Sequence, residues 1–324
     1  MICIRLIREW TLTFRVPVVL YLTISSSIVT LSIAYHFNKS VDLLSWLVAS
    51  LVAWFTQGFI THVWNDIYDW LSGTDKLVDI NKSIGGGSRV IHFFYRNDNV
   101  FKHLRNHIPW LAVCTIAVYY FGVVLGWWWY VLLGAIAAVI ISVFYTAPPI
   151  QACYRPYIGE FVFMFGGLVL CNTFIYYAAA HTWPSVAPLL CVVLYTTGYL
   201  FGLGMHHMHD VYPDLHADRK KYTAISWLYE RTKDTKAIVN KYFIPVSIIG
   251  VAVALMLCSM GIWQSLVFIP LYLYGVSWIA NKYKYLDFDK YPEYLETTVP
   301  MEIKWMKAQV LIGLIFATLL AVLH

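Results

Sequence analysis

Nine stretches of predominantly apolar residues alternate with polar segments along the chain. Each is roughly 17 to 25 residues long, which is the length that a helix needs to cross about 30 Å of hydrocarbon. The pattern predicts nine membrane-spanning helices, at 12–36, 42–64, 108–126, 128–147, 159–180, 186–208, 242–261, 264–280 and 306–323. The expected fold is therefore an all-α, polytopic membrane protein, and we expect residues 1–324 to form a single domain.

The composition agrees with this pattern and narrows the class of protein. Hydrophobic residues make up 60% of the chain and charged residues 13%, and the mean hydropathy is +0.62. Such values lie far outside the range of soluble domains. The net charge of +5 does not indicate nucleic-acid binding, because no soluble segment carries a basic helix or a stacking platform. The six cysteines show no CxxC spacing, which argues against a zinc site or a disulfide framework.

The placement of charge predicts the orientation of the chain. With the N-terminus inside, every one of the 23 lysines and arginines except Lys39 falls on the inner side of the nine spans. Cytoplasmic loops are the ones that concentrate these residues. We therefore expect a cytoplasmic N-terminus, an ionic cap made by the long cytoplasmic loops, and the chemistry of the protein on that face, at the inner membrane if the cell is bacterial.

A first acidic cluster lies at the inner end of the second span. On a helix, Asp66 and Asp69 are three residues apart and point the same way, and Asn65 can add an amide ligand or orient a carboxylate. The dipeptide Ser72-Gly73 is expected to end this helix and let the chain turn back. Whether Asp75 binds metal or caps the turn is left open.

A second acidic cluster follows the sixth span. The spacing of Asp210, Asp214 and Asp218 predicts one stripe along a helix, with Pro213 as a possible kink. Two such stripes facing each other would bind two or more Mg²⁺ ions and leave positions for phosphate oxygens. The alternatives are solvated helix ends, or a cation pathway as in a transporter.

Two further motifs accompany the acidic clusters on the same side of the membrane. The segment Ile84-Gly85-Gly86-Gly87-Ser88-Arg89 is a glycine-rich turn that presents backbone N–H groups and a guanidinium to an anion. The segment Tyr145-Thr146-Ala147-Pro148-Pro149 ends the fourth span and places a phenol at the membrane surface, where it can also be a plain interfacial anchor.

Together, these four motifs resemble those of the UbiA superfamily of intramembrane aromatic prenyltransferases, in particular its menaquinone branch, which prenylates 1,4-dihydroxy-2-naphthoate. The resemblance covers nearly the whole chain. It implies helices around a central cavity that shelters a prenyl tail. It also implies Mg²⁺-dependent transfer from a prenyl diphosphate to an aromatic acceptor within the lipid bilayer.

The resemblance also implies roles for individual residues. Asp66, Asp69, Asp214 and Asp218 would hold the metal ions, with Asn65 and Asp210 supporting them. Arg89 would grip the diphosphate and Tyr145 would line the reacting centre. Close relatives carry a lysine where this chain has Gln151, so that phosphate contact is weakened or supplied by Arg155. Lys221 is the equivalent of a further basic residue in a segment that is shorter here.

Four histidines beside the second cluster have no counterpart in this resemblance. His206, His207 and His209 precede Asp210, and His216 lies between Asp214 and Asp218. They can be metal ligands, a general base, or satisfied polar packing, although adjacent positions point about 100° apart on a helix and cannot all converge.

Three hypotheses for function follow from the sequence. The first is the aromatic prenyltransferase. The second is a terpene cyclase on the same scaffold, in which the prenyl cation attacks its own alkene; Gln151 and the unusual histidines favour it slightly. The third is a cation transporter or binding protein, which the almost wholly apolar third, fourth, seventh and ninth spans disfavour.

Overall fold

The computed structural model describes residues 2–13, 18–83, 87–283 and 286–323, and all regular secondary structure within them is helical. The α-helices are α1 Ile2–Thr13, α2 Val18–Asn38, α3 Leu43–Phe55, α4 Thr61–Ser72, α5 Thr74–Leu77, α6 Ile108–Ala117, α7 Trp128–Ser142, α8 Gly166–Ala180, α9 Val186–His209, α10 Val211–His216, α11 Ala224–Thr232, α12 Thr235–Ile238, α13 Ile244–Ser259, α14 Phe268–Tyr283 and α15 Leu295–Val322. The all-α prediction is confirmed for these residues.

Seven continuous helical stretches among the described residues are long and apolar enough to cross a membrane: Leu43–Ser72, Val100–Val124, Ile158–Ala180, Val186–His209, Thr235–Ser259, Trp263–Tyr283 and Leu295–Val322. Several of them join two elements through a 3-10 or π segment, as η1 (Thr56–Ile60) joins α3 to α4. Each overlaps one of the predicted spans. The two other predicted spans, 12–36 and 128–147, overlap α2 and the shorter apolar helix α7. The count of nine spans stays a prediction.

Two predicted spans are shorter than the helices that contain them, in a way that matters for the site. The second span was predicted to end at 64, and the helix of the first acidic cluster was predicted to end at Ser72-Gly73; one continuous helical stretch, Leu43–Ser72, contains both. The last span was expected to begin at 306, but its helix begins at Leu295 and so includes Glu302. Charged residues lower the hydropathy at these ends, although the backbone hydrogen bonds of the helices continue through them.

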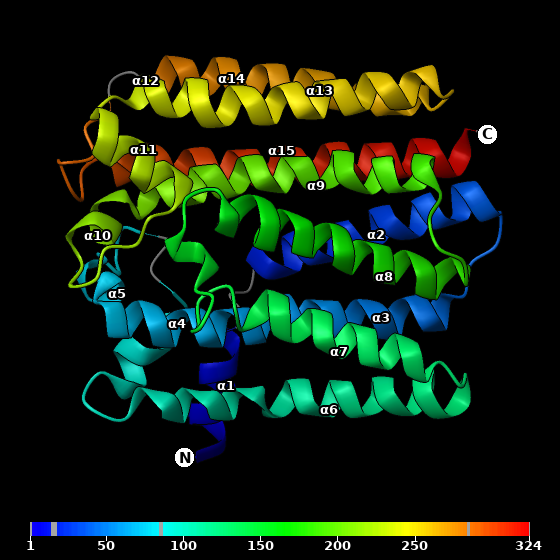
Figure 1. The fold of residues 1–324 in the computed structure, drawn as a ribbon, viewed down its shortest axis with the longest axis horizontal. Coiled ribbons are helices and arrows are strands. Elements are labelled where there is room, and N and C mark those ends of the chain that lie inside the picture. Colours follow the sequence, from blue (N-terminus) through cyan, green and yellow to red (C-terminus); the bar gives the residue numbers. More distant parts are fainter. Residues whose placement is uncertain (1, 14–17, 84–86, 284–285, 324) are drawn as a thin grey trace.

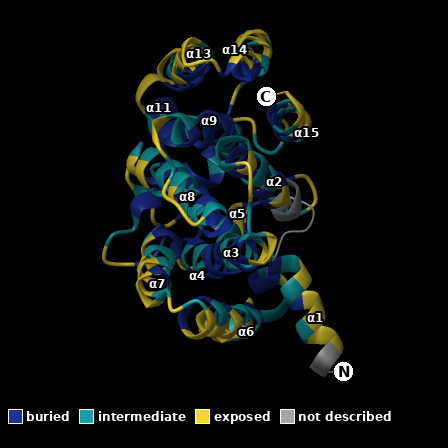
Figure 2. Cartoon of the chain, turned by 90° about the vertical axis from the view of Figure 1, so that its right-hand side faces the viewer, coloured by how far each residue is buried: buried dark blue, intermediate teal, exposed yellow. Residues whose placement is uncertain are grey.

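The long helices run side by side along one direction (Figure 1). Close packing joins α15 to α2 and α9, α8 to α2 and α3, and α13 to α9 and α14. Viewed from the end of the bundle, exposed residues lie mainly on the outer helices, whereas buried residues face the middle (Figure 2). This arrangement places α2, α4, α8, α9 and α15 around the interior.

Aromatic rings packed on glycines hold the interior together. The ring of Trp305 stacks on Phe201 with centroids 4.0 Å apart and lies against Gly275, where an added Cβ would be 2.5 Å from the indole. Tyr195 packs on Gly313 in the same way, 2.3 Å from the position of an added Cβ. Small residues let helices approach closely, as is typical of packing within membranes.

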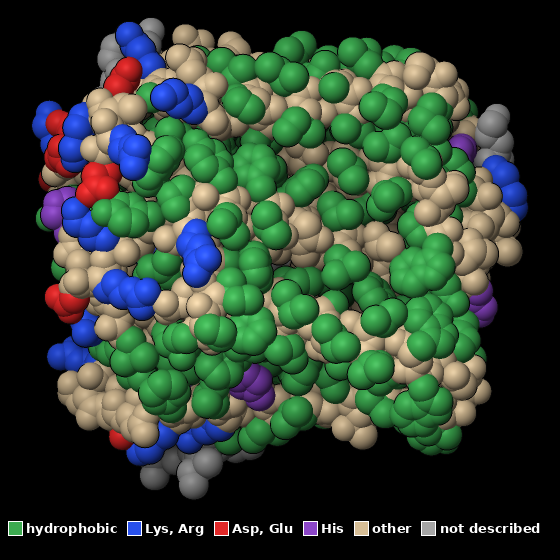
Figure 3. Space-filling view, viewed as in Figure 1, with side chains coloured by type: hydrophobic (Ala, Val, Ile, Leu, Met, Phe, Trp, Pro, Cys, Tyr) green, Lys and Arg blue, Asp and Glu red, His purple; other side chains and the backbone are tan. Residues whose placement is uncertain are grey.

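Charged side chains gather at one end of the molecule. Lys, Arg, Asp and Glu cluster beside α10 and α11, while the visible long face of the bundle is mostly hydrophobic (Figure 3). Exposed apolar side chains on α6 and α7 include Leu111, Leu132 and Ile136. A surface with an apolar girdle and one ionic end is that of an integral membrane protein.

Candidate metal and diphosphate site

The first acidic cluster lies on the last turns of α4, at the charged end. As predicted, the helix ends at Ser72, and Gly73 adopts a left-handed conformation with φ of +90° that turns the chain into α5. Asp66 and Asp69 are both buried. The two carboxylates nevertheless have different surroundings.

Asp69 points toward the second half of the chain. Its Oδ2 accepts hydrogen bonds from Asn65 Nδ2 at 2.9 Å and from Lys221 Nζ at 2.7 Å. Its Oδ1 is buried and has no hydrogen-bond partner within the described ranges. Asn65 therefore orients Asp69, which is one of the two roles that the sequence allowed, and Lys221 connects the two acidic clusters.

Asp66 instead organises the glycine-rich turn. Its Oδ1 accepts the backbone N–H of Ser88 at 2.7 Å, and its Oδ2 accepts from the Ser88 hydroxyl and from His103 Nε2, the latter at 3.1 Å. Asn106 Nδ2 lies 3.2 Å from His103 Nδ1 and can donate only, so Nε2 of the buried His103 carries the proton that faces Asp66. His103 was not predicted to belong to the site.

Part of the glycine-rich turn lies outside the described residues, namely Ile84, Gly85 and Gly86. The described part has φ of +69° at Gly87, where an added Cβ would lie 2.5 Å from Asp75 Oδ2 and 2.6 Å from Asp66 Oδ1. The guanidinium of Arg89 donates to the Ser83 carbonyl, and Arg89 lines a small cavity together with Asp66 and Asp75. Arg89 and Asp75 therefore both belong to this end of the site.

The second acidic cluster does not form the continuous stripe that its spacing predicted. Helix α9 ends at His209, α10 runs from Val211 to His216, and Ala217 is extended. Asp218 consequently lies beyond the helix and is exposed, with its carboxylate 3.0 Å from where a Cβ of Gly73 would be. Pro213 is followed by a single further turn of helix, so the i, i+4, i+8 geometry is lost.

Asp214 and Asp210 face the interior. Asp214 is fully buried, and neither of its carboxylate oxygens has a hydrogen-bond partner. Asp210 Oδ1 is likewise buried and unpaired. Together with Asp69 Oδ1, four carboxylate oxygens from three aspartates lack any donor among the described residues.

The three aspartates interact electrostatically, with Lys221 among them. Burial raises the pKa of Asp214 well above its ordinary value; Lys221 opposes this shift, and the charges of Asp210 and Asp69 add to it. Burial alone would lower the pKa of Lys221, but the charges of Asp69 and Asp214 contribute to raising it well above its ordinary value. Burial and the neighbouring Asp69 and Asp66 also raise the pKa of Asp75 well above normal. The carboxylates around Asp69 and Asp214 thus carry more negative charge than the single ammonium group of Lys221 can balance.

The remaining predicted residues are divided between the interior and the surface. Tyr145 is buried, and its phenol lies within electrostatic range of Lys221 and Asp69. Arg155, in contrast, is exposed. Gln151 contacts a basic side chain: its Oε1 accepts a hydrogen bond of 2.7 Å from Arg219 Nη2.

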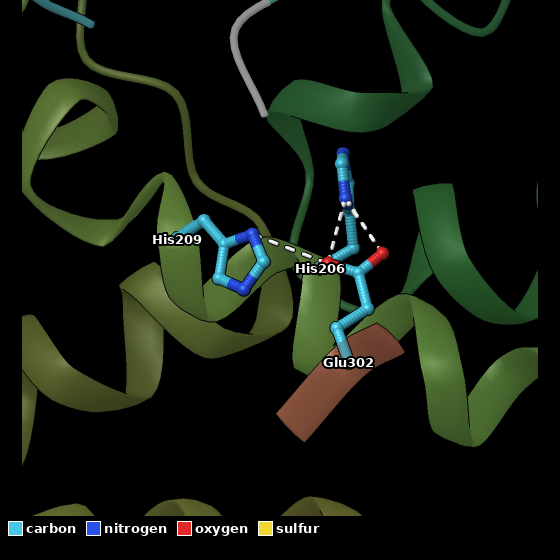
Figure 4. Close-up of side chains that lie close together, drawn as sticks. All are labelled: His206, His209 and Glu302. Carbon is cyan, nitrogen blue, oxygen red and sulfur yellow. Dashed lines mark hydrogen bonds and ion pairs between the residues drawn. The ribbon is translucent and has the colours of Figure 1, made fainter. Parts of the chain in front are cut away.

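The histidines contact two buried glutamates that the sequence analysis did not select. His206 Nδ1 lies 3.1 Å from Glu302 Oε1, and His209 Nδ1 lies 3.2 Å from Glu302 Oε2 (Figure 4). His207 Nδ1 lies 3.1 Å from Glu160 Oε1. The sequence could have identified both glutamates, because each lies within or beside an apolar helix, where ionisable residues are commonly functional.

A cavity of about 190 Å³ lies among α2, α4, α8, α9 and α15. Its wall is mostly apolar, with polar side chains from several helices: Gln57, His62, Tyr199, His206, Glu302 and Gln309. A second cavity of about 240 Å³ is bounded mainly by apolar residues of α3, α6, α7 and α8. The structure thus contains a central cavity, as the resemblance implied, and the polar side chains that face it are ones that no sequence pattern had revealed.

No known protein-family model matches the sequence, and no curated protein is significantly similar to it. Among solved structures, the chain is similar to that of a UbiA homologue from Archaeoglobus fulgidus bound to GPP and Mg²⁺, with a TM-score of 0.58 and 15% identity. The match covers 96% of this chain and 99% of that chain. The two chains therefore share one helical fold from end to end.

Proposed function

We propose that this protein is an intramembrane prenyltransferase that binds a prenyl diphosphate with Mg²⁺ and transfers the prenyl group to an aromatic acceptor. The observation that carries the proposal is the set of four buried carboxylate oxygens on Asp69, Asp210 and Asp214 that no donor of the described part of the chain reaches. Burying charge without a partner is costly, and oxygen ligands are those that Mg²⁺ prefers. The shared fold with a homologue bound to GPP and Mg²⁺ supports the same assignment.

The donor set fits Mg²⁺. Asp69, Asp210 and Asp214 would hold the metal ions, with Asp66 and Asp218 as further candidate ligands and Asn65 orienting Asp69. Bound there, Mg²⁺ would supply positive charge for the diphosphate leaving group. Asp66 also holds the turn that carries Arg89, and it does so through Ser88.

The cationic side chains of this end would bind the diphosphate. Lys221 is buried beside Asp69, and the Arg89 side chain lines the small cavity next to Asp75. Exposed Arg155 and Arg219 lie on the surface and would meet the ligand on entry. Opposite charges held in a dry pocket interact more strongly than in water, so Lys221 would contribute most.

In the proposed reaction, the C1–O bond of the prenyl diphosphate breaks and its electron pair leaves with the diphosphate. A ring carbon of the acceptor bonds to C1, and the proton on that ring carbon passes to a base. The Tyr145 phenol lies near Lys221 and Asp69 and would line the reacting centre. The surrounding buried residues exclude water, which would otherwise capture the prenyl cation.

The central cavity is the proposed place for the acceptor. Its polar side chains, among them Gln57, Tyr199 and Gln309, can orient hydroxyl or carboxylate groups of a dihydroxynaphthoate-like or phenolic ring. These few polar side chains in an otherwise apolar wall favour the transferase over the terpene cyclase, because a cyclase needs no polar partner for its hydrocarbon. We further propose nine spans with the ionic end and the N-terminus in the cytoplasm.

The test is to incubate detergent-purified protein and Mg²⁺ with geranyl, farnesyl or geranylgeranyl diphosphate, with and without aromatic acceptors, and to identify products by mass spectrometry. Prenylated acceptor that requires Mg²⁺ and both substrates would support the proposal. Cyclic terpene formed from diphosphate alone would replace the transferase with the cyclase. Products unchanged by Asp214→Asn would refute the assigned site, with exposed Glu293→Gln as the matched control.

A further inference from the structure

A second group of possible metal ligands lies beside the carboxylate site. His206 and His209 are three residues apart on α9, and Glu302 comes from α15 (Figure 4). One ligand atom from each of these three residues lies within 4.8 Å of the other two. Contacts between neighbouring helices hold the group in place, because α9 and α15 pack closely.

The two imidazoles approach different oxygens of the same carboxylate. His206 Nδ1 is 3.1 Å from Oε1, and His209 Nδ1 is 3.2 Å from Oε2 of Glu302. In a tetrahedral site with bonds of about 2.0–2.1 Å, ligand atoms are about 3.4 Å apart. Small rotations of the side chains are therefore enough to bring the nitrogens and the carboxylate around one ion.

His209 provides an independent indication of a ligand. Its side chain is fully buried, and neither of its ring nitrogens meets hydrogen-bond geometry in the part of the chain that the structure describes. Nδ1 faces Glu302 Oε2 at 3.2 Å, and the backbone of Thr298 is a further polar neighbour of the ring. A buried imidazole whose nitrogens are incompletely satisfied is costly, and an ion bound between Nδ1 and the carboxylate would satisfy Nδ1.

We propose that His206, His209 and Glu302 form a binding site for a divalent first-row transition metal such as Zn²⁺ or Fe²⁺. Two imidazoles and one carboxylate are typical ligands of these ions, whereas Mg²⁺ is bound through oxygen and water. Three protein ligands leave at least one coordination position open. Because His206 and Glu302 line the central cavity, that position faces the cavity and can take an oxygen atom of a molecule bound there.

A neighbouring carboxylate supports this geometry. Asp210 Oδ2 lies 4.0 Å from His206 Nε2, the nitrogen that does not face Glu302. This separation is longer than a hydrogen bond, but it places a carboxylate on the side to which histidine ligands commonly direct their other nitrogen. The proposed site is thus adjacent to the Asp69–Asp214 cluster but uses a different, nitrogen-containing ligand set.

The test uses Co²⁺ as the probe, on tag-free protein in detergent with excess Mg²⁺ present to occupy the oxygen site. Visible absorption of bound Co²⁺ reports coordination, and equilibrium dialysis with elemental analysis reports stoichiometry. We expect one Co²⁺ per chain, with a visible absorption spectrum typical of coordination by nitrogen ligands. His209→Ala and the near-isosteric Glu302→Gln should each weaken its binding at least about tenfold.

Two control variants separate this site from other sources of binding. His216→Ala removes an exposed histidine that stacks on Tyr212, and Asp214→Asn changes the oxygen site. Both should keep the Co²⁺ spectrum. The proposal is overturned if wild-type protein binds no Co²⁺ under excess Mg²⁺, or if Glu302→Gln, with an unchanged elution profile and helix content, binds it as wild type does. Neither readout needs turnover, so the result stands apart from the prenyltransferase assignment.

Discussion

Replacing Asp214 with asparagine is expected to stabilise the metal-free protein while it abolishes turnover. Asp214 is fully buried, and both of its carboxylate oxygens lack hydrogen-bond partners among the residues that the structure describes. The ammonium group of Lys221 donates to Asp69, and the backbone N–H of Lys221 donates to the Asp214 carbonyl at 2.9 Å. The nearest cation is therefore already hydrogen-bonded to another carboxylate, although its charge also acts on Asp214.

The size of the effect follows from this burial. A buried, unsatisfied polar group costs about 1–3 kcal/mol and a charged one more. Asparagine keeps the shape and removes the charge, so we expect a gain of about 1–3 kcal/mol for Asp214→Asn in EDTA. Wild-type protein should recover the difference when metal binds, since a ligand at 100 times its Kd stabilises by about 2.7 kcal/mol.

The gain should also depend on pH. Burial raises the pKa of Asp214 in the folded protein well above its ordinary value, which the group regains on unfolding. A carboxyl of this kind destabilises the folded state increasingly as pH rises from its unfolded pKa, about 3.9, toward its folded pKa. The advantage of Asp214→Asn should therefore vanish below about pH 4 and grow toward neutral pH.

The assay is thermal unfolding of detergent-solubilised protein, followed by tryptophan fluorescence in EDTA and in Mg²⁺ with geranyl diphosphate. The melting temperature of Asp214→Asn should exceed that of wild type in EDTA and show no Mg²⁺-dependent rise. The exposed Glu293→Gln should behave as wild type in both solutions. A lower melting temperature for Asp214→Asn in EDTA, together with a full Mg²⁺ response, would refute the argument.

Three other substitutions have clear expected outcomes. Gly87→Ala should destabilise the turn and reduce diphosphate binding, because φ is +69° and the new Cβ would meet two carboxylates; normal binding in a titration would contradict this. Lys221→Met should cost about 3–5 kcal/mol in EDTA, since it leaves Asp69 buried without its ion pair, and added Mg²⁺ should restore much of the melting temperature. Glu9→Gln should cost about 1–3 kcal/mol at neutral pH, because the buried carboxylate accepts from two arginines and a tyrosine. Burial opposes the shift, but these donors lower the pKa of Glu9, so the difference from wild type should shrink as pH falls below about 4.

The sequence by itself determined the class of fold and the position of the ionic end. Apolar stretches of membrane length dictate helices, because a backbone in hydrocarbon must satisfy its own hydrogen bonds. The local sequence also predicted correctly where α4 ends, because Ser72 is followed by Gly73, which adopts the left-handed conformation. The Asn65–Asp69 cluster therefore came to the charged end as expected.

Only the tertiary structure decided what each acidic residue contacts. Asp66 and Asp69 share one helical face, yet the first binds Ser88 and the second binds Lys221, which is far away along the chain. The prediction that Asp210, Asp214 and Asp218 form one helical stripe was wrong at Asp218, because α10 ends at His216 and the chain is extended at Ala217. Such pairings depend on how helices pack, and residue spacing reports only neighbours within one helix.

The cluster of His206, His209 and Glu302 shows most clearly that residue spacing cannot predict contacts between helices. From the sequence, His206 and His209 were two of several adjacent histidines, and Glu302 was an isolated acid nearly a hundred residues away. The packing of α15 against α9 brings the glutamate to within 3.2 Å of both rings. Local sequence determines which residues form a helix and which side they face, but the partner of a buried polar group is set by the helix packed against it.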